Sequence, residues 1–461
     1  MLLKERVSMK ENIAIILAAG QGTRMKSDMP KVLHKICGKS LIQHVLDHCT
    51  DASITKKYVV VGHKHEEIRK ALEDTVEYVL QEQQLGTGHA IMQAKDILEE
   101  NLESNIIVLM GDAPLISSHT LDKFIKLHEE NKNSVTVLTA TTKSPHGYGR
   151  IVKDQSGNLL KIVEQKDATE QEKQIQEINS GVYCFKGKDL VDALSKLTND
   201  NAQGEYYLTD VIEIMKKDHL IAGVYNTCEE DIKAVNSKRE LAEADFIMRR
   251  RINNKLMDAG VTIIDPNCTY IGADVIIGRD TIIYPGTIIE GDTVIGEKTT
   301  IGTNCKIVSS QIGDRVDIQS STVLESEIMN ETKVGPYAYI RPNCTIGERV
   351  KIGDFVEVKN STIGNDTKAS HLTYIGDAKV GSGVNLGCGV VFVNYDGKKK
   401  HQTIVEDDCF IGCNVNLIAP ANIKKGSYIA AGSTITEPVE EDTLAIARCK
   451  QINKVGYIKN K

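Results

Sequence analysis

Two stretches of this 461-residue chain combine residue types and spacings that fit chemistry, and the first is a glycine-rich turn. It reads LAAGQGTRM at 17–25 and is followed by PKVLH at 30–34. Gly20 lets backbone N–H groups approach phosphate oxygens closely, while Arg24 and Lys31 supply positive charge. The turn is neither a Walker loop nor a clean GxGxxG, and a glycine turn after a strand is also a common packing device. The pattern therefore indicates phosphate binding and leaves a purely structural turn open.

An acidic residue follows a later apolar run in a position that suits a metal ligand. Asp112 ends NIIVLMGD (105–112), which is expected to be a buried strand. A carboxylate at the carboxyl end of a strand is well placed to hold Mg²⁺ beside nucleotide phosphates. The alternative is that Asp112 only caps the segment that follows it.

The second stretch is centred on His371 in SHLTY, within a region of six-residue repeats. His371 is the third residue of a repeat unit that starts at Ala369, a corner position that should face away from the interior. On position alone, an outward histidine is a solvated surface residue. The expected neighbours of this histidine are polar or charged, namely Arg341, Lys359 and Tyr374.

Two departures from the repeat lie around and after His371. The segment 356–378 is expected to break the pattern, and FVNYDGKKKHQT (392–403) cannot be divided into six-residue units. The second segment should therefore leave the coil as a loop, and loops on a rigid scaffold are where binding residues concentrate. Because imidazole serves as a base near neutral pH, this region is a candidate catalytic site.

The elements that must position the first group alternate between strands and helices. Buried strands are expected at 13–20, 57–63, 105–112 and 133–141, with an amphipathic helix at 40–50. This alternation predicts a mostly parallel sheet covered on both faces. Residues 237–259 lack Gly and Pro and should form one linker helix that stops at Gly260.

Beyond that helix the hydrophobic period changes to six residues. It runs unbroken through Ile271, Ile277, Ile283, Ile289, Ile295, Ile301 and Ile307, then slips and resumes twice. A small residue recurs four places after each aliphatic one, as at Val275, Thr281, Thr287, Thr293, Thr299 and Cys305. This period fits short strands joined by corners into a parallel coil with both residue types inside. Cys305, Cys344 and Cys409 are expected to be small buried residues in that interior.

Composition excludes several classes of protein. The net charge is −7, from 56 basic and 63 acidic residues that are well mixed, so we expect neither nucleic-acid nor membrane partners. The first ten residues have no apolar core of a secretory signal, and no run of about 18 uncharged apolar residues occurs. The eleven cysteines are scattered singly, which favours free thiols in the cytoplasm.

The strings LAAGxGTRM and PKVLH resemble those of sugar-1-phosphate nucleotidyltransferases that use nucleoside triphosphates. With GYGR (147–150), EINSG (177–181) and SHLTY, the chain resembles the bacterial bifunctional UDP-N-acetylglucosamine pyrophosphorylases/glucosamine-1-phosphate acetyltransferases. The resemblance implies an α/β plus all-β protein in three parts. These are a Rossmann-like nucleotidyltransferase domain at 11–236, a linker helix at 237–260, and a left-handed parallel β-helix of hexapeptide repeats at 261–461.

For the N-terminal domain, the resemblance implies transfer of UMP from UTP to N-acetylglucosamine 1-phosphate with release of pyrophosphate. Arg24 and Lys31 would offset charge on the phosphates, and Asp112 and Asn236 would hold Mg²⁺. The implied nucleotide contacts are Leu17, Ala18, Ala19, Gly20, Lys31, Gln81, Gly86 and Thr87, and the implied sugar contacts are Gly149, Glu164 and Asn179.

For the C-terminal domain, it implies acetyl transfer from acetyl-CoA to glucosamine 1-phosphate, which supplies the first site with its sugar. His371 would be the base, and Glu357 a carboxylate that orients or tunes it. The implied sugar-phosphate contacts are Arg341, Lys359, Tyr374 and Asn385, and the implied acetyl-CoA contacts are Cys388, Asn394, Tyr395, Cys413, Ala431 and Arg448. The family forms homotrimers with this site between subunits, and its product feeds peptidoglycan and lipopolysaccharide synthesis.

Three places in the C-terminal domain depart from the family pattern. Cys388 stands where Ala is common, Cys413 where Ser is common, and ARCKQ (447–451) replaces ARxPQ. Two alternatives remain open. The coil could serve only regulation or assembly of a sugar pyrophosphorylase, as in glucose-1-phosphate adenylyltransferases, or it could be an inert trimeric scaffold.

Overall fold

The computed structural model describes residues 11–458, so the first ten residues, where no secretory signal is expected, lie outside it. Those residues form two compact units, one reaching Met248 and the other starting at Arg249. The change of unit falls within α8 (Lys238–Asp258), which confirms the helix predicted there. Over the described range, each helix is too short or too polar to cross a lipid bilayer.

The N-terminal unit is built on a nine-stranded mixed sheet whose main order is β11-β7-β10-β6-β1-β4-β5. The pairs that flank β1 are parallel, whereas β10 runs antiparallel to both β6 and β7. The strands are β1 (Asn12–Ala18), β4 (Lys56–Val61), β5 (Glu77–Leu80), β6 (Asn105–Met110), β7 (Val135–Thr141), β8 (Arg150–Lys153), β9 (Leu159–Val163), β10 (Glu177–Lys186) and β11 (Ala222–Thr227), with a separate pair β2 (Lys35–Ile36) and β3 (Lys39–Ser40).

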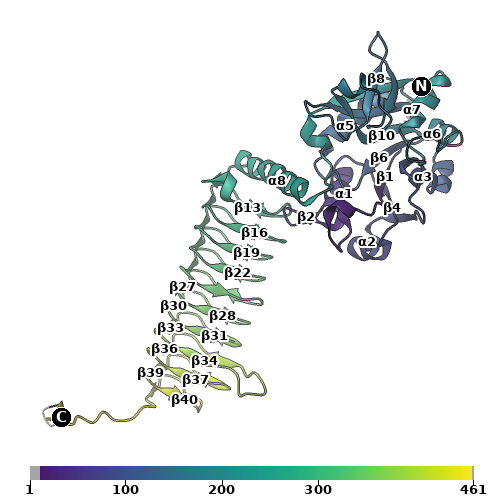
Figure 1. Cartoon of the computed structure of the whole chain (residues 1–461). Coiled ribbons are helices and arrows are strands. Elements are labelled where there is room, and N and C mark those ends of the chain that lie inside the picture. The colour runs from purple at the N-terminus through teal and green to yellow at the C-terminus, as the bar shows by residue number, and fades with distance from the viewer. Residues whose placement is uncertain (1–10, 459–461) are drawn as a thin grey trace, which may run out of the picture. The chain divides into compact units, whose positions relative to one another are not determined.

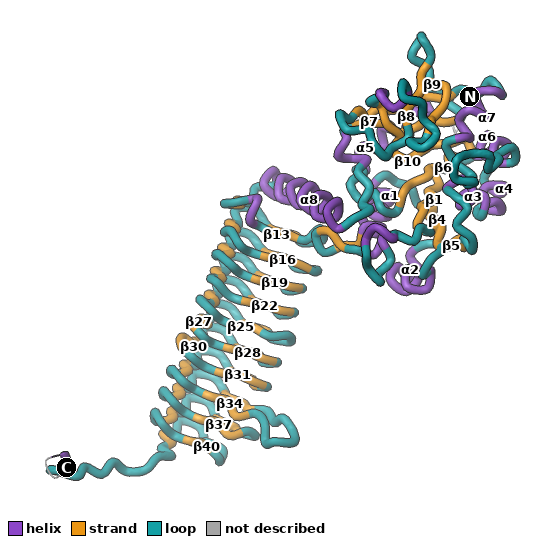
Figure 2. The backbone as a smooth tube through the Cα atoms, viewed as in Figure 1, coloured by secondary structure: helices purple, strands orange, loops and turns teal. Residues whose placement is uncertain are grey.

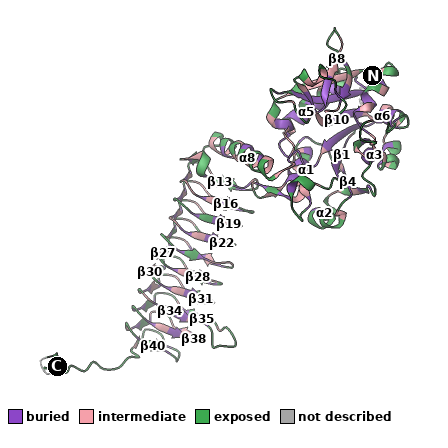
Figure 3. Cartoon of the chain, viewed as in Figure 1, coloured by how far each residue is buried: buried purple, intermediate pink, exposed green. Residues whose placement is uncertain are grey.

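Helices cover both faces of this sheet, as the continuous apolar strands predict. Ile13 and Ile15 of β1 contribute to one core, and Ala14 and Ile16 to the core on the other face. Figure 3 shows β1 in the colour of buried residues. The helices are α1 (Leu41–Asp51), α2 (His65–Leu72), α3 (Thr87–Met92), α4 (Lys95–Glu100), α5 (Ser118–Glu130), α6 (Gly187–Leu194) and α7 (Asp210–Lys217). The helix predicted at 40–50 is therefore confirmed as α1.

The register of the central strands places the two chemical segments side by side. Leu17 at the end of β1 pairs with Met110 at the end of β6. Just beyond, the N–H of Gly111 donates to the carbonyl of Leu17 at 2.9 Å. The glycine-rich turn and Asp112 thus leave the same edge of the sheet.

The C-terminal unit is a left-handed parallel β-helix of three ladders, seen as repeated short strands in Figures 1 and 2. The first coil sheet contains β12 (Thr262–Ile263), β15 (Ile282–Ile283), β18 (Thr300–Ile301), β21 (Asp317–Ile318), β24 (Lys333–Val334), β27 (Lys351–Asp354), β30 (Lys368–His371), β33 (Asn385–Leu386), β36 (Phe410–Ile411), β39 (Tyr428–Ile429) and β41 (Leu444–Ala445). The second contains β13 (Tyr270–Ile271), β16 (Ile288–Glu290), β19 (Lys306–Val308), β22 (Thr322–Leu324), β25 (Tyr339–Ile340), β28 (Glu357–Lys359), β31 (Tyr374–Gly376), β34 (Val391–Val393), β37 (Asn416–Ile418) and β40 (Thr434–Ile435). The third contains β14 (Ile276–Ile277), β17 (Val294–Ile295), β20 (Gln311–Ile312), β23 (Glu327–Ile328), β26 (Thr345–Ile346), β29 (Thr362–Ile363), β32 (Ala378–Val380), β35 (Thr403–Val405) and β38 (Ala421–Ile423).

The interior of the coil holds the two predicted residue types. The aliphatic residues of the repeat form one continuous core, in which Ile283 and Ile289 are fully buried. The small residues are buried too, and several of their hydroxyls bond the neighbouring turn: Thr281 donates to the carbonyl of Gly296 at 2.8 Å. A hydroxyl satisfied in this way does not carry the cost of burying an unpaired polar group. Cys305, Cys344 and Cys409 are buried in this interior as expected.

Where the six-residue period slips, one of the three sides of a coil turn has five residues instead of six. Ile282 pairs with Thr300 on the next turn, whereas Lys306 pairs with Thr322, a turn shorter by two residues. The expectation that 356–378 breaks the repeat is wrong, because β28 to β32 continue all three ladders through it. A five-residue side shifts the register without interrupting strand pairing.

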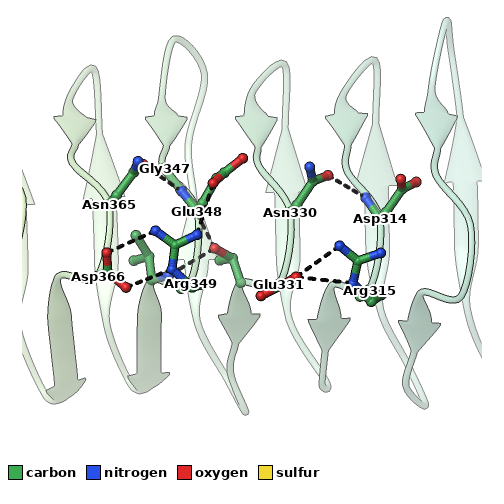
Figure 4. Close-up of polar contacts among 11 residues, drawn as sticks. Asp314, Arg315, Asn330, Glu331, Gly347, Glu348, Arg349, Asn365 and Asp366 are labelled. Atoms are coloured by element: carbon green, nitrogen blue, oxygen red, sulfur yellow. Dashed lines mark hydrogen bonds and ion pairs between the residues drawn. The ribbon is translucent and has the colours of Figure 1, made fainter.

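The corner that leads from the third coil sheet into the first carries polar contacts between successive turns (Figure 4). The Asn330 side chain accepts a hydrogen bond from the N–H of Asp314 at 2.8 Å. Further along, the Arg349 guanidinium pairs with Asp366 at 2.8 Å. This ion pair and the one between Arg315 and Glu331 are about half exposed, so each contributes little to stability.

One loop leaves the coil where the sequence predicted it. Residues 394–402 lie between β34 and β35 and contain only the isolated bridge of Tyr395 with Lys400. This loop projects beyond the stacked strands next to β34 and β37 (Figure 2). Asp396 holds its tip, since the carboxylate accepts from the N–H groups of Lys398 and Lys399 and from His401.

Candidate functional site

A cavity of about 240 Å³ opens at the sheet edge where β1 and β6 end. All the residues predicted to contact the nucleotide line it: Leu17, Ala18, Ala19, Gly20, Lys31, Gln81, Gly86 and Thr87. Asp112 is part of the same wall. Arg24 lies outside this lining, exposed on the short 3₁₀ turn Thr23–Met25 that follows the glycine-rich segment.

Lys31 and Asp112, which line this cavity, meet Asn236, which lies outside its lining. The Lys31 ammonium pairs with Oδ2 of Asp112 and donates to the side-chain oxygen of Asn236 at 3.0 Å. Oδ1 of Asp112 is buried without a hydrogen-bond partner among the described atoms. Two oxygens from separate elements therefore converge on one cationic group, and one carboxylate oxygen is still available for a cation.

A loop above the cavity is tied to the segment that precedes α7. Nε2 of Gln81 donates to the carbonyl of Gly86 at 3.2 Å, and the N–H of Gly88 donates to the carbonyl of Tyr206 at 2.8 Å. Gly86 has φ +107°, and a Cβ there would lie 2.6 Å from the Tyr206 carbonyl oxygen. Only glycine fits this backbone, so the loop rests directly against its neighbour.

A second cavity of about 260 Å³ adjoins the first and is lined by the predicted sugar contacts Gly149, Glu164 and Asn179. Asp112 and Thr87 line both cavities. The Asn179 amide donates to the Tyr183 hydroxyl at 2.8 Å, and its oxygen accepts from the N–H of Gly181. Burial raises the pKa of the Glu164 carboxyl above its ordinary value. No role was predicted for Tyr183 or Thr209, which also line this cavity, although Thr209 lies in GEYYLTD (204–210), one of the strings that resemble the family.

Three of the four predicted sugar-phosphate residues of the coil, Arg341, Lys359 and Tyr374, lie on or directly after strands of the second coil sheet. Arg341 follows β25 and donates to the Glu357 carboxylate on β28 at 2.8 Å, and Glu357 pairs in register with Tyr374 on β31. Asn385 instead points outward from the first coil sheet, where it pairs in register with Lys368.

Two charged residues near this group were not predicted from the sequence. Asp377 lies 3.6 Å from the Lys359 ammonium and accepts from the Asn394 amide at 2.5 Å. Lys400, on the projecting loop, is within hydrogen-bonding reach of Lys359, and this neighbour lowers the pKa of Lys400. Two ammonium groups held this close form a suitable place for a phosphate. The KKK run offered a signal for Lys400, but its placement depends on how the loop folds back.

His371 belongs to a line of residues that we call the corner ladder. The pairing of β27, β30, β33, β36 and β39 puts one residue of each turn at the same position, where the first coil sheet ends. The members of the corner ladder are Asp354, His371, Cys388, Cys413 and Ala431. His371 is exposed, as predicted, and both thiols are exposed beside it. The predicted base and three predicted acetyl-CoA contacts thus share one edge.

The imidazole of His371 has a close partner that the sequence did not reveal. Its Nδ1 lies 2.7 Å from Oδ1 of Asp354, the preceding member of the corner ladder. The pKa of Asp354 is lowered, first by this hydrogen bond. Glu357, which was predicted to orient His371, has its carboxylate on Arg341 instead.

Two predicted acetyl-CoA contacts lie on segments outside the three coil sheets. Tyr395 is exposed on the projecting loop, where its hydroxyl donates to the carbonyl of Gly397 at 2.7 Å. Arg448 is exposed beyond β41, in the segment that follows the coil. The structure therefore gathers the other coil residues more closely than these two.

The fold and the two clusters define a nucleotidyltransferase joined to a hexapeptide-repeat acyltransferase. Residues 13–237 match the profile described as nucleotidyl transferase, and residues 325–360 match the bacterial transferase hexapeptide profile (six repeats). A bifunctional protein GlmU from Clostridium perfringens is 56% identical over 449 residues, covering 97% of this chain and 98% of that protein. Those from Clostridium novyi and Clostridioides difficile are 53% and 52% identical, with coverage of 97% of this chain and of 98% and 97% of those proteins.

The chain belongs to the GlmU family of bifunctional enzymes. It is a transferase with two activities, a uridylyltransferase carried by the nucleotidyltransferase fold and an acetyltransferase carried by the hexapeptide coil. A coil that serves only assembly or regulation is thereby excluded.

Proposed function

We propose that the two clusters described above are the two active sites and that they act in sequence. The coil acetylates glucosamine 1-phosphate, and the N-terminal unit then joins the product to UMP from UTP. The observation that carries the proposal is the pair of adjoining cavities that share Asp112, one lined by the nucleotide residues and one by the sugar residues. A nucleotide α-phosphate and a sugar phosphate would meet at that shared wall.

The uridylyl step needs positioning and charge more than a nucleophilic side chain. A phosphate oxygen of the sugar phosphate attacks the α-phosphorus of UTP, the bond to the leaving pyrophosphate breaks, and the chain supplies cations around the phosphates. Lys31 would turn from Asp112 toward these oxygens, and Arg24 would reach them from its exposed turn. Gln81, Gly86 and Thr87 would hold the base and ribose.

Mg²⁺ fits the residues present at this wall. Proteins bind Mg²⁺ through one or two protein oxygens together with substrate phosphates. Asp112 and Asn236 supply such a pair, already arranged around the Lys31 ammonium, and Oδ1 of Asp112 is unpartnered. When bound, the ion would neutralise charge on the phosphates as they react.

The acetyl step is amine attack on a thioester. The glucosamine nitrogen bonds to the acetyl carbon, the carbon–sulfur bond breaks, and the proton lost by the nitrogen passes to His371 and then to the departing CoA sulfur. Arg341, Lys359 and Tyr374, with Asn385 alongside, would hold the sugar phosphate. Residues proposed to hold acetyl-CoA are Cys388, Asn394, Tyr395, Cys413, Ala431 and Arg448.

The domain bounds, the cellular location, the oligomeric state and the binding partners are part of the same proposal. The domains are 11–236, 237–260 and 261–461, and the protein works in the cytoplasm as a homotrimer. The exposed position of His371 on a flat-sided coil supports a second copy completing the site. Its partners are small molecules, namely the two sugar phosphates, UTP and acetyl-CoA.

Both half-reactions can be tested on the intact chain. We expect free thiol release from acetyl-CoA only when glucosamine 1-phosphate is present, and pyrophosphate release from UTP and N-acetylglucosamine 1-phosphate only with Mg²⁺. The acetyl assignment fails if the His371→Ala variant releases thiol at the native rate. A preference for ATP, dTTP or glucose 1-phosphate would overturn the uridylyl assignment.

A further inference from the structure

Asp354 and His371 are brought together by the pairing of the two longest strands in the first coil sheet. β27 and β30 are both four residues long, and they pair in register through Lys351 with Lys368 and through Asp354 with His371. The N–H of Leu372 then donates to the carbonyl of Asp354 at 2.9 Å. The backbone therefore holds the carboxylate and the imidazole at matching positions on adjacent turns.

A glycine permits this approach. A Cβ on Gly353 would lie 1.9 Å from the Ser370 carbonyl oxygen, closer than any side chain tolerates. Gly353 directly precedes Asp354, and Ser370 directly precedes His371. The absence of a side chain at 353 is what lets the two functional groups stand 2.7 Å apart.

The tautomer of His371 follows from the partner. An ionised carboxylate can only accept hydrogen bonds, so Nδ1 of the imidazole must donate to Asp354. The hydrogen bond to His371 holds the pKa of Asp354 below its ordinary value, which keeps the carboxylate ionised. Nε2 is then the basic nitrogen that remains for substrate.

The Glu357 carboxylate is hydrogen-bonded to Arg341 and not to His371. Its carboxylate accepts from the Arg341 guanidinium at 2.8 Å, one coil side away from the corner ladder. A carboxylate committed to a guanidinium orients that guanidinium, and Arg341 is proposed to bind phosphate.

We propose that Asp354 is the positioning residue of the acetyltransfer base, holding His371 in the Nδ1–H tautomer with Nε2 directed to the amine. The inference rests on the proposed function, because it requires His371 to be the base. During reaction Nε2 takes the proton lost by the attacking nitrogen and passes it to the CoA sulfur, while the Nδ1 proton stays in its hydrogen bond to Asp354. The carboxylate stabilises the imidazolium formed in between.

Other charged and titratable groups surround this pair. They are Lys351 on β27, Lys368 on β30, the Cys388 thiol after β33, and Tyr374 on β31. Each is unchanged by a substitution at 354, so a shift in the pH profile of such a variant reports the lost carboxylate.

The test is Asp354→Asn in the full-length chain, measured by thiol release. We expect kcat for acetyl transfer to fall about 10-fold to 100-fold with both KM values within about twofold, since orientation of a base is lost while binding is kept. The acid limb of the kcat profile should move to lower pH, because the imidazolium loses a facing negative charge. Asp354→Glu should restore part of kcat.

Three controls separate the possible outcomes. Asp366→Asn removes a carboxylate that pairs with Arg349 on the other corner, and should leave acetyl transfer unchanged. Uridylyl transfer by the Asp354→Asn chain should also match the native rate. Glu357→Gln should raise KM for glucosamine 1-phosphate and leave the acid limb in place.

The inference is overturned if Asp354→Asn keeps the native kcat and acid limb while His371→Ala is inactive. It is also overturned if Glu357→Gln is the variant that moves the acid limb. If His371→Ala itself retains full acetyl transfer, the proposed function fails instead, so the two failures are distinguishable.

Discussion

The two proposed sites differ in how much of the reaction space one chain encloses. In the N-terminal unit, two adjoining cavities share Asp112, and nearly all the predicted residues line one or the other. On the coil, the proposed base is 59% exposed, and its neighbours are spread along an outer corner and one flat side. The residues of the first site enclose a cavity, whereas those of the second lie open on the surface of the coil.

The difference follows from how each fold brings distant residues together. The sheet gathers several strand ends at one edge, so residues from the segments 17–31, 81–87 and 147–181 can surround a ligand. The coil can only stack residues one turn apart, which yields lines such as the corner ladder. A solenoid of this kind gains a cleft only from a projecting loop or from another copy.

The largest expected effect separates the sites completely. We expect Asp112→Asn to lower uridylyl transfer at least about 100-fold, because the carboxylate that pairs with Lys31, and that is proposed to hold Mg²⁺, loses its charge. Acetyl transfer by the same chain should be unchanged, as measured by thiol release. Equal losses in both assays would show that the comparison is wrong and that Asp112 supports the whole fold.

Alkylation of cysteine thiols should affect only the proposed acetyl-transfer site on the coil. Cys388 and Cys413 are exposed members of the corner ladder, whereas Cys305, Cys344 and Cys409 are buried in the coil. We expect N-ethylmaleimide to block acetyl transfer and to spare uridylyl transfer in the same sample, because Cys388 and Cys413 share the corner ladder with His371, whereas the accessible thiols of the N-terminal unit, Cys37 and Cys228, lie outside the lining of both cavities. Inhibition of acetyl transfer that survives in the Cys388→Ala/Cys413→Ser chain would contradict this.

A phosphate contact on the coil should affect binding more than turnover. We expect Arg341→Gln to raise KM for glucosamine 1-phosphate about tenfold, since a charge-assisted hydrogen bond is worth about 1.5–3 kcal/mol. Arg349→Gln is the matched control, because Arg349 also pairs with a carboxylate on the coil, at Asp366. A similar rise in KM for both variants would point to a general effect of surface charge.

Local patterns were enough to predict the frame of both sites. The apolar runs and the six-residue period encode burial directly, so β1, β6, α8 and the coil interior were found where expected. The partner of His371 could not be found this way. With ideal turns of three six-residue sides, His371 would stack on Gly353, and the five-residue side between Val358 and Ile363 moves it to Asp354. Lys400 was missed because the path of a loop depends on contacts that no short pattern encodes.

The smallest expected effect is a pH-dependent change in stability next to the enclosed site. Burial, followed by repulsion from Glu213 and Asp167, raises the pKa of Asp210 to about 6. Because the native state then binds this proton more tightly than the unfolded chain does, stability falls as pH rises from about 4 to about 6 and stays lower above that range. Asp210→Asn removes the charge and should therefore stabilise the N-terminal unit at pH 7.5.

We expect a gain of about 1 kcal/mol, or about 2–4 °C in Tm, from Asp210→Asn. The value is reduced because Asp210 is only partly buried, and because its place in the first turn of α7 favours a negative charge. Thermal melts at pH 7.5 and pH 4 measure it, and the gain should nearly vanish at pH 4, where the native side chain is already protonated. Asp192→Asn, at an exposed site on α6, should show no such pH dependence. A variant less stable than the native chain at pH 7.5 would mean that the dipole of α7 outweighs burial at this position.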